Sequence, residues 1–178
     1  MKWLKRFAVA LPLVICGYAD LSSSFSDFDF TVQPKVQDKN STTARHEQVT
    51  KVNWVYDVTA ENKSARDYAD VEFQYIIFRK EALVANKSGA SKMVRKTGSV
   101  KAPAVAAHGR FTFTTEAMLI ETTQLTGGYV WRNGANSRTF DSLQGIWIKV
   151  LSGGKQVGEF TAPADLGNRE KWDAPGKP

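Results

Sequence analysis

The amino-acid sequence predicts an all-β protein, an antiparallel β-sandwich of about seven strands with little helix. Three observations support this fold class. Apolar residues alternate with polar ones, at the period of two that half-buried strands require, through most of the chain after residue 20. Short runs rich in Asn, Gly, Pro and Ser separate the alternating segments. Helical periodicity never extends beyond a turn or two in that part of the chain, and a closed barrel is the alternative that periodicity leaves open.

The first three predicted strands lie in the amino-terminal half of the chain. They are DFDFTVQPKV (27–36), TKVNWVYDVTAEN (50–62) and DVEFQYIIFRK (70–80), and in each the apolar side chains share one face. The predicted core takes its residues from the second and third strands and from a later one: Val52, Trp54, Tyr56, Val58, Val71, Phe73, Tyr75, Ile77, Ile146 and Ile148.

The carboxyl-terminal half predicts further strands and one short helix. GRFTFTTEAMLIETT (109–123) begins as a strand, although the stretch from Glu116 to Glu121 is ambiguous between strand and helix. QGIWIKVLSGGKQVGEFTAP (144–163) is a hairpin, because its Ser-Gly-Gly turn accepts positive φ angles. Asn133-Gly134 predicts one more short hairpin. A helix of a turn or two is expected between Asp165 and Trp172.

The first 19 residues have the order of a secretory signal peptide. Lys2, Lys5 and Arg6 precede an apolar run that is too short to span a bilayer. Gly17 and Ala19 are small residues at the two positions that a signal peptidase reads. We therefore expect cleavage after Ala19, with no transmembrane segment in the mature chain.

Cys16 is the only cysteine in the chain, and lipidation of this residue is the alternative to simple cleavage. A lipoprotein leader needs a small residue directly before its cysteine, whereas Ile15 is bulky, so we expect an unlipidated mature protein that begins at Asp20. Export without disulfides is ordinary for bacterial envelope proteins. The expected location is therefore the periplasm, the outer-membrane surface or the extracellular space of a bacterium. Residues 20–178 are expected to form a single domain with a flexible N-terminal segment and C-terminal tail.

The charge balance gives no support for a nucleic-acid partner. The chain has 24 basic and 18 acidic residues, and the leader holds three of the basic ones and no acid, which leaves the mature chain at 21 against 18. Nucleic-acid binding requires a concentrated basic face, which this mild excess does not predict.

The sequence offers few catalytic or metal-binding residues. His46 and His108 lie far apart and outside any metal-ligand spacing, and we expect both on solvated turns. Neither Asp70 with Glu72 nor the acids around residue 120 carry the signs of burial that a glycosidase pair requires. We therefore expect a protein without enzymatic activity, cofactor or metal.

The best candidate for binding is the glycine-rich connector TGGYVWRNGANSRTF (126–140). Aromatic and arginine side chains on a loop give contact area and directed hydrogen bonds. The candidate binding residues are Tyr129, Trp131, Arg132, Asn133, Arg138 and Phe140. The alternative is a hairpin whose Trp131 folds onto the edge of the sandwich.

Two other stretches have a structural and a binding interpretation. NKSGASKMVRKTGSVK (86–101) carries five basic residues and no acid, and it is more typical of an edge strand protected by lysines than of a ligand site. SSSFSDFDFTV (22–32) is a docking or exchanged strand if its phenylalanines find no partner within the domain.

The order of these features resembles that of small exported immunoglobulin-like proteins of verrucomicrobial gut bacteria that are encoded near type IV pilus-like genes. The resemblance rests on VNWVYDVTAENKSARDYADVEFQYIIF (52–78), on GIWIKVLSGGKQVGEFTAPADL (145–166), and on the tail NREKW (168–172). A type IV pilin would begin its mature chain with a long apolar helix, and DLSSSFSDFDF (20–30) departs from that pattern. The resemblance therefore implies a pilus-associated accessory protein or surface partner and not a shaft subunit.

The expected function is that of an exported interaction module with protein partners in the cell envelope or pilus. The alternative is an adhesin that binds carbohydrate or mucin, with host glycans as partners, through residues 127–140.

Overall fold

The computed structural model describes residues 26–172, which form two antiparallel β-sheets and one short helix. The leader, Cys16 and the last six residues lie outside the described part of the chain. The strands are β1 (Phe28–Ala44), β2 (Glu47–Asn62), β3 (Tyr68–Ala82), β4 (Ser91–Val105), β5 (Arg110–Thr114), β6 (Met118–Leu125), β7 (Arg138–Phe140), β8 (Ser142–Ser152) and β9 (Lys155–Ala162), and the helix is α1 (Leu166–Arg169).

The two sheets have an immunoglobulin-like strand order. One sheet runs β1-β2-β6-β7, with β5 also paired to β2, and the other runs β4-β3-β8-β9. β5 and β6 pair with successive halves of β2, so they correspond to one strand that is interrupted at residues 115–117. With β5 and β6 counted together, the fold has the predicted seven long strands. The three-residue β7 is additional.

Thr115 closes the interruption between β5 and β6. Its main-chain N–H donates to the Tyr56 carbonyl at 3.0 Å, and its hydroxyl accepts from the Tyr56 N–H at 2.9 Å. The side chain thus replaces a ladder bond, which keeps the buried main chain paired. The ambiguous stretch that follows forms β6 from Met118 onward and is not helical.

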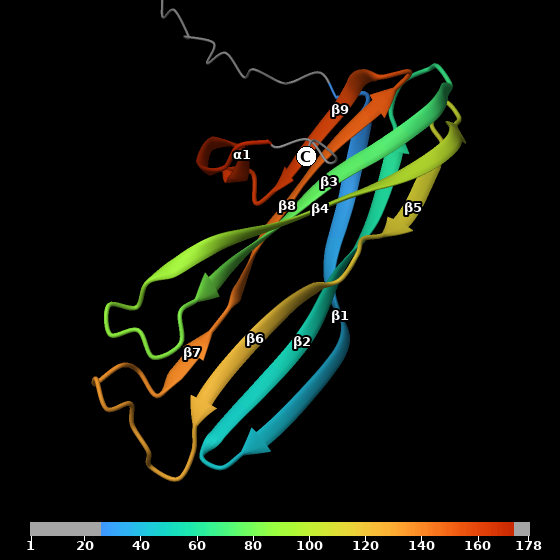
Figure 1. Ribbon diagram of the computed structural model, residues 1–178. Helices are drawn as coiled ribbons and strands as arrows, with labels where there is room; N and C mark the ends of the chain where they lie inside the picture. The colour runs from blue at the N-terminus through green and yellow to red at the C-terminus, as the bar shows by residue number, and fades with distance from the viewer. Residues whose placement is uncertain (1–25, 173–178) are drawn as a thin grey trace, which may run out of the picture.

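The core lies between the sheets in the half of the molecule that contains the start of β1. Eight of the ten predicted core residues are buried, with Phe73, Ile77, Ile146 and Ile148 at 0% exposure. The prediction was wrong for Val52, which is only half-buried, whereas Trp54 is also half-buried but packs against the core. The sheets diverge beyond the middle of the molecule, where β1, β2 and β6 extend past the facing strands (Figure 1).

The carboxyl-terminal segment covers the outer face of the second sheet. Leu166 of α1 is fully buried in a cluster with Ile76, Phe78 and Trp147, and Trp172 packs against the same cluster. The predicted short helix near residues 165–172 is therefore confirmed, and it explains why alternate residues on both faces of β3 are apolar.

Candidate interaction surface

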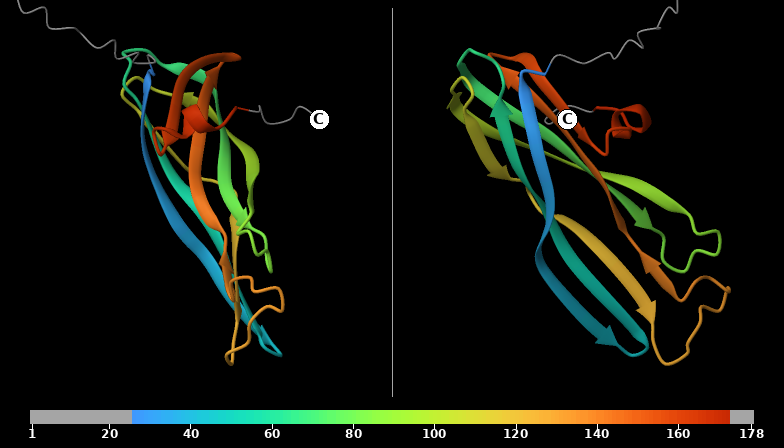
Figure 2. Two further views of the ribbon diagram at one scale, coloured as in Figure 1. Left: turned by 90° about the vertical axis from the view of Figure 1, so that its left-hand side faces the viewer. Right: turned by 180° about the vertical axis from the view of Figure 1, so that it is seen from behind.

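Three connections meet at the end of the molecule opposite the start of β1 (Figures 1 and 2). They are the β1–β2 turn (45–46), the β3–β4 connection (83–90) and the β6–β7 loop (126–137). We call these connections, together with β7, the distal end. The Thr126 N–H donates to the His46 carbonyl at 2.8 Å, so the long loop is held against the β1–β2 turn.

Asn133 holds the long loop against the β3–β4 connection. Its Nδ2 donates to the Ala85 carbonyl at 2.7 Å, and its Oδ1 accepts from the Ala135 N–H at 3.0 Å. Both ends of the amide are therefore used within the protein. The predicted Asn-Gly hairpin was wrong: Gly134 N–H bonds to the Trp131 carbonyl in an isolated turn, and no strand flanks that turn.

The remaining predicted binding residues occupy two separate places. Tyr129 is 50% exposed and stacks on His46, with the ring centroids 3.7 Å apart and the planes at 22°. Arg132 in the same loop is exposed, whereas Trp131 is half-buried. Arg138 and Phe140 lie on β7, where they line a pocket with the β3–β4 connection.

This cavity, which we call the β7 pocket, measures about 230 Å³. Its lining includes Lys80, Leu83, Asn86, Arg138, Phe140 and Ser142. A second hollow of about 210 Å³ also borders β7, and its lining includes Val84, Leu119, Thr139 and Asp141. Most of these lining residues were missed by the sequence analysis, because the β3–β4 connection gave no sign that it lies beside β7.

Asp141 positions β7 by joining three strands at the point where the chain leaves the first sheet for the second. Its Oδ1 accepts from the Ala82 N–H at 3.0 Å, and its Oδ2 accepts from the Glu121 N–H at 3.2 Å. The Arg79 guanidinium lies 3.3 Å from the same carboxylate, and the two side chains are 15% and 7% exposed. This buried ion pair was also missed, since an acid in the sequence TFDSL resembles a surface residue.

Arg79 also contacts neighbours other than Asp141. Its Nη1 donates to the Leu119 carbonyl, and its Nη2 donates to Glu81 at 3.0 Å. Its Nε is buried and has no hydrogen-bond partner among the described residues. The pair with Asp141 is thus the centre of a network that fixes the walls of both hollows.

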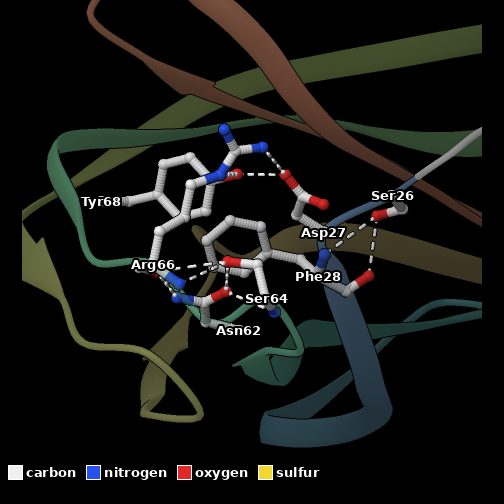
Figure 3. A network of polar contacts seen from close by, with 7 residues as sticks. All are labelled: Ser26, Asp27, Phe28, Asn62, Ser64, Arg66 and Tyr68. Atoms are coloured by element: carbon white, nitrogen blue, oxygen red, sulfur yellow. Dashed lines mark hydrogen bonds and ion pairs between the residues drawn. The ribbon is translucent and has the colours of Figure 1, made fainter.

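A second polar network lies at the opposite end and fastens the start of β1 (Figure 3). The Tyr68 hydroxyl donates to Asp27, and Arg66 donates to the same carboxylate at 2.9 Å. Asn62 is fully buried and donates to the Arg66 carbonyl at 2.8 Å, while its Oδ1 accepts from Ser64. Because every partner lies within the domain, we interpret this network as structural.

The contacts of Asp27 shift the pKa of its own carboxyl group and that of the Tyr68 hydroxyl. The Tyr68 hydroxyl, and after it Arg66, hold the pKa of Asp27 below its ordinary value despite partial burial. Burial, and then the bond to the carboxylate, raise the pKa of Tyr68. Both shifts favour the state in which Tyr68 donates to an ionised Asp27.

The structural interpretation accounts for β4 and for the start of β1, although Asn86 at the beginning of the basic stretch lines the β7 pocket. β4 is an edge strand, as predicted, and three of its cations are paired: Lys92 with Glu81 at 3.4 Å, Arg95 with Glu170 at 2.9 Å and Lys96 with Glu116 at 3.2 Å. The docking-strand interpretation of residues 22–32 was wrong for Phe28 and Phe30. Phe28 is 3% exposed, and Phe30 packs on Phe160.

The residues considered for catalysis lie apart and in contact with solvent. His46 and His108 are exposed at turns, as expected. Glu116 and Glu121 lie beside Lys96 and Lys51. Within residues 26–172, no three His, Cys, Asp or Glu side chains gather as a metal site. No helix in this part of the chain has the length and hydropathy needed to cross a membrane.

Comparison with known proteins finds only distant structural matches. No protein-family profile matches the chain, and no curated protein matches its sequence. A structural-genomics target protein aligns at 11% identity over 76% of this chain and 85% of its own, with a TM-score of 0.38. A protein from Akkermansia muciniphila aligns at 13% identity over 82% and 78%, with a TM-score of 0.30. A β-glucuronidase from Bacteroides uniformis aligns at 12% identity over 69% of this chain but 12% of the enzyme, with a TM-score of 0.29.

Proposed function

We propose that this protein is an exported, non-enzymatic interaction module of the bacterial envelope, associated with pili, which contacts a protein partner through its distal end. One observation carries the proposal. Of eight large apolar side chains that are exposed in the described part of the chain, six lie at the distal end or line the hollow beside β7: Leu83, Val84, Leu119, Tyr129, Val130 and Phe140.

Grouping at one end distinguishes this surface from ordinary scattered exposure. Single exposed apolar residues are normal, whereas a group of them that is rimmed by polar residues is typical of protein–protein contact. Val130 is 75% exposed and Phe140 is 61% exposed, and Arg132 and Arg138 lie beside them in the chain. Loops at one end of a β-sandwich are also the usual place for binding, because the sheets hold them rigidly.

The location and the absence of catalysis rest on the sequence. The leader supports export, and the resemblance to small exported proteins encoded near pilus-like genes supports association with pili. The two histidines lie on solvated turns, and Glu116 and Glu121 lie beside cations, which supports a non-enzymatic role.

Fractionation of the producing bacterium tests the proposal. In the combined variant Tyr129→Ser, Val130→Ser, Phe140→Ser, the protein should leave the envelope and pilus fraction and accumulate free, because the apolar contact is lost. A matched variant on the sandwich body, Thr112→Ser with Thr114→Ser, should fractionate as the wild type does. Unchanged fractionation of a folded distal variant would refute the proposal.

The second candidate is a carbohydrate- or mucin-binding adhesin that uses residues 127–140. The stack of Tyr129 on His46 favours it, because an aromatic ring held on one face and half exposed is a platform on which a sugar ring can stack. Binding of the wild type to immobilised mucin glycans, lost in Tyr129→Ala and retained in Val130→Ser, would select this function over the first.

A further inference from the structure

The β7 pocket carries positive charge that is not neutralised. Lys80 and Arg138 are its only charged lining residues, and neither has an ion pair within residues 26–172. The neighbouring cations differ: Arg79 and Lys92 both pair with Glu81, at 3.0 Å and 3.4 Å. The two unpaired cations therefore favour an anionic group in this pocket.

The same pocket presents exposed apolar surface. Phe140 and Leu83, which are 61% and 39% exposed, lie on its two sides, one from β7 and the other from the β3–β4 connection. Cations next to exposed apolar side chains suit a ligand that is anionic and apolar at adjacent positions.

The edge of β7 away from β6 has no strand partner among the described residues, although the end of β3 approaches it where Ala82 N–H bonds to the Asp141 carboxylate. The Leu125 N–H bonds to Ser137, and the Asp141 N–H bonds to Glu121, so hydrogen bonding to β6 falls on the odd-numbered residues of this segment. By the alternation of an antiparallel ladder, the N–H and C=O groups of Arg138 and Phe140 point away from β6. Among the described residues, β7 has no strand partner other than β6.

We infer that the β7 pocket binds an extended acidic peptide segment of a protein partner. The peptide main chain pairs with the free edge at Arg138 and Phe140, a carboxylate lies between Lys80 and Arg138, and the neighbouring apolar side chain packs on Phe140 and Leu83. An unpaired strand edge beside apolar side chains favours a peptide over an anionic glycan, which would leave the edge unpaired. This inference rests on the proposed function and names the chemistry of the partner.

The test uses a blocked peptide of alternating glutamate and valine, about six residues long, the length of a typical strand. Added to the full mature protein at low salt, it should shift the amide NMR signals of Leu83, Arg138 and Phe140. A peptide with glutamine in place of glutamate should bind at least about tenfold more weakly, because charge pairing with the two cations is lost.

Variants locate the site. Lys80→Gln with Arg138→Gln should remove the preference for the acidic peptide, while Lys101→Gln with Lys155→Gln, which changes two exposed lysines elsewhere, should retain it. Phe140→Ser should weaken binding of both peptides without changing the melting temperature. Signal shifts elsewhere, an equal preference in both double variants, or tighter binding of a sulfated oligosaccharide at this pocket would overturn the inference.

The fractionation experiment distinguishes a failure of the peptide inference from a failure of the proposed function. If the distal apolar variant leaves the envelope fraction but no acidic peptide binds, the proposed function stands and the peptide inference fails. If fractionation is unchanged, both fail.

Discussion

At the scale of single residues, the side chains that shape the distal end are those that look ordinary in the sequence. Asp141 and Asn133 would be assigned to a polar turn, yet one forms a buried ion pair and the other ties two loops together. Their roles depend on which strand ends meet in space, and residue type and spacing do not report that. The aromatic residues Tyr129 and Phe140 were named from the sequence because a glycine-rich connector that carries them is typical of contact surfaces.

Replacement of Asp141 by alanine should lower the free energy of unfolding by about 3 kcal/mol, because it removes one of the two carboxylates that pair with the buried Arg79 and leaves two main-chain N–H groups without an acceptor. Urea denaturation measures the change. Asp165→Ala, which removes an exposed i,i+4 pair with Arg169, is the control and should cost about 0.5 kcal/mol or less. Equal losses in the two variants would show that Asp141 does not join the strands.

Asp27 makes stability depend on pH in the acid range. Its folded-state pKa lies below the unfolded value of about 3.9, so its stabilisation is complete above that value and is lost as pH falls through the folded pKa. Melting temperatures measured between about pH 5 and pH 2 should therefore fall more steeply for the wild type than for Asp27→Asn. Tyr68→Phe, which removes one donor, should lie between the two. Parallel curves would contradict the assignment.

At the scale of elements, the alternation of apolar and polar residues predicted which side chains are buried where the two sheets face each other. It predicted burial less well where one sheet extends alone. β2 shows this within one strand: Tyr56 and Val58 are buried, whereas Val52 and Trp54 on the same face are half-buried because the facing sheet has diverged. The period of two indicates that residues share a face, but it does not indicate what covers that face. β7 is too short for periodicity to reveal.

Substitutions should cost more unfolding free energy where the two sheets face each other than where the first sheet extends alone. Phe73→Ala should lower the free energy of unfolding by about 3–5 kcal/mol, because Phe73 is fully buried and packs on Phe28, Phe111 and Phe113. Trp54→Ala should cost less despite the larger side chain. If chemical denaturation showed a greater loss of unfolding free energy for Trp54→Ala than for Phe73→Ala, the main core would not lie around Phe73.

Packing of Trp131 should stabilise the β6–β7 loop. Trp131 is half-buried, so Trp131→Ala should lower the melting temperature by about 3–5 °C through lost packing. Arg132→Ala, a change at the exposed neighbour, serves as the control and should melt with the wild type. A melting temperature unaffected by Trp131→Ala would instead favour Trp131 as a contact residue.

At the scale of the whole molecule, the two ends of the sandwich differ in kind. At the end that contains the start of β1, Asp27 bonds to Tyr68 and Asn62 bonds to the Arg66 carbonyl, so these polar groups are satisfied within the domain. The distal end presents exposed apolar side chains, and the β7 pocket beside them is lined by Lys80 and Arg138. The β-sandwich itself could be predicted from the sequence, whereas the contrast between its ends could not, because it depends on which loops the topology brings together.

The central claim is that the distal end is the contact surface. A photo-crosslinking amino acid placed at Val130 in the producing bacterium tests it most directly, with Thr112 on the sandwich body as the matched position. Crosslinking at position 130 should join the protein to one discrete envelope or pilus protein, and crosslinking at position 112 should not. Crosslinking of the same partner with equal yield from both positions, or from position 112 alone, would contradict it.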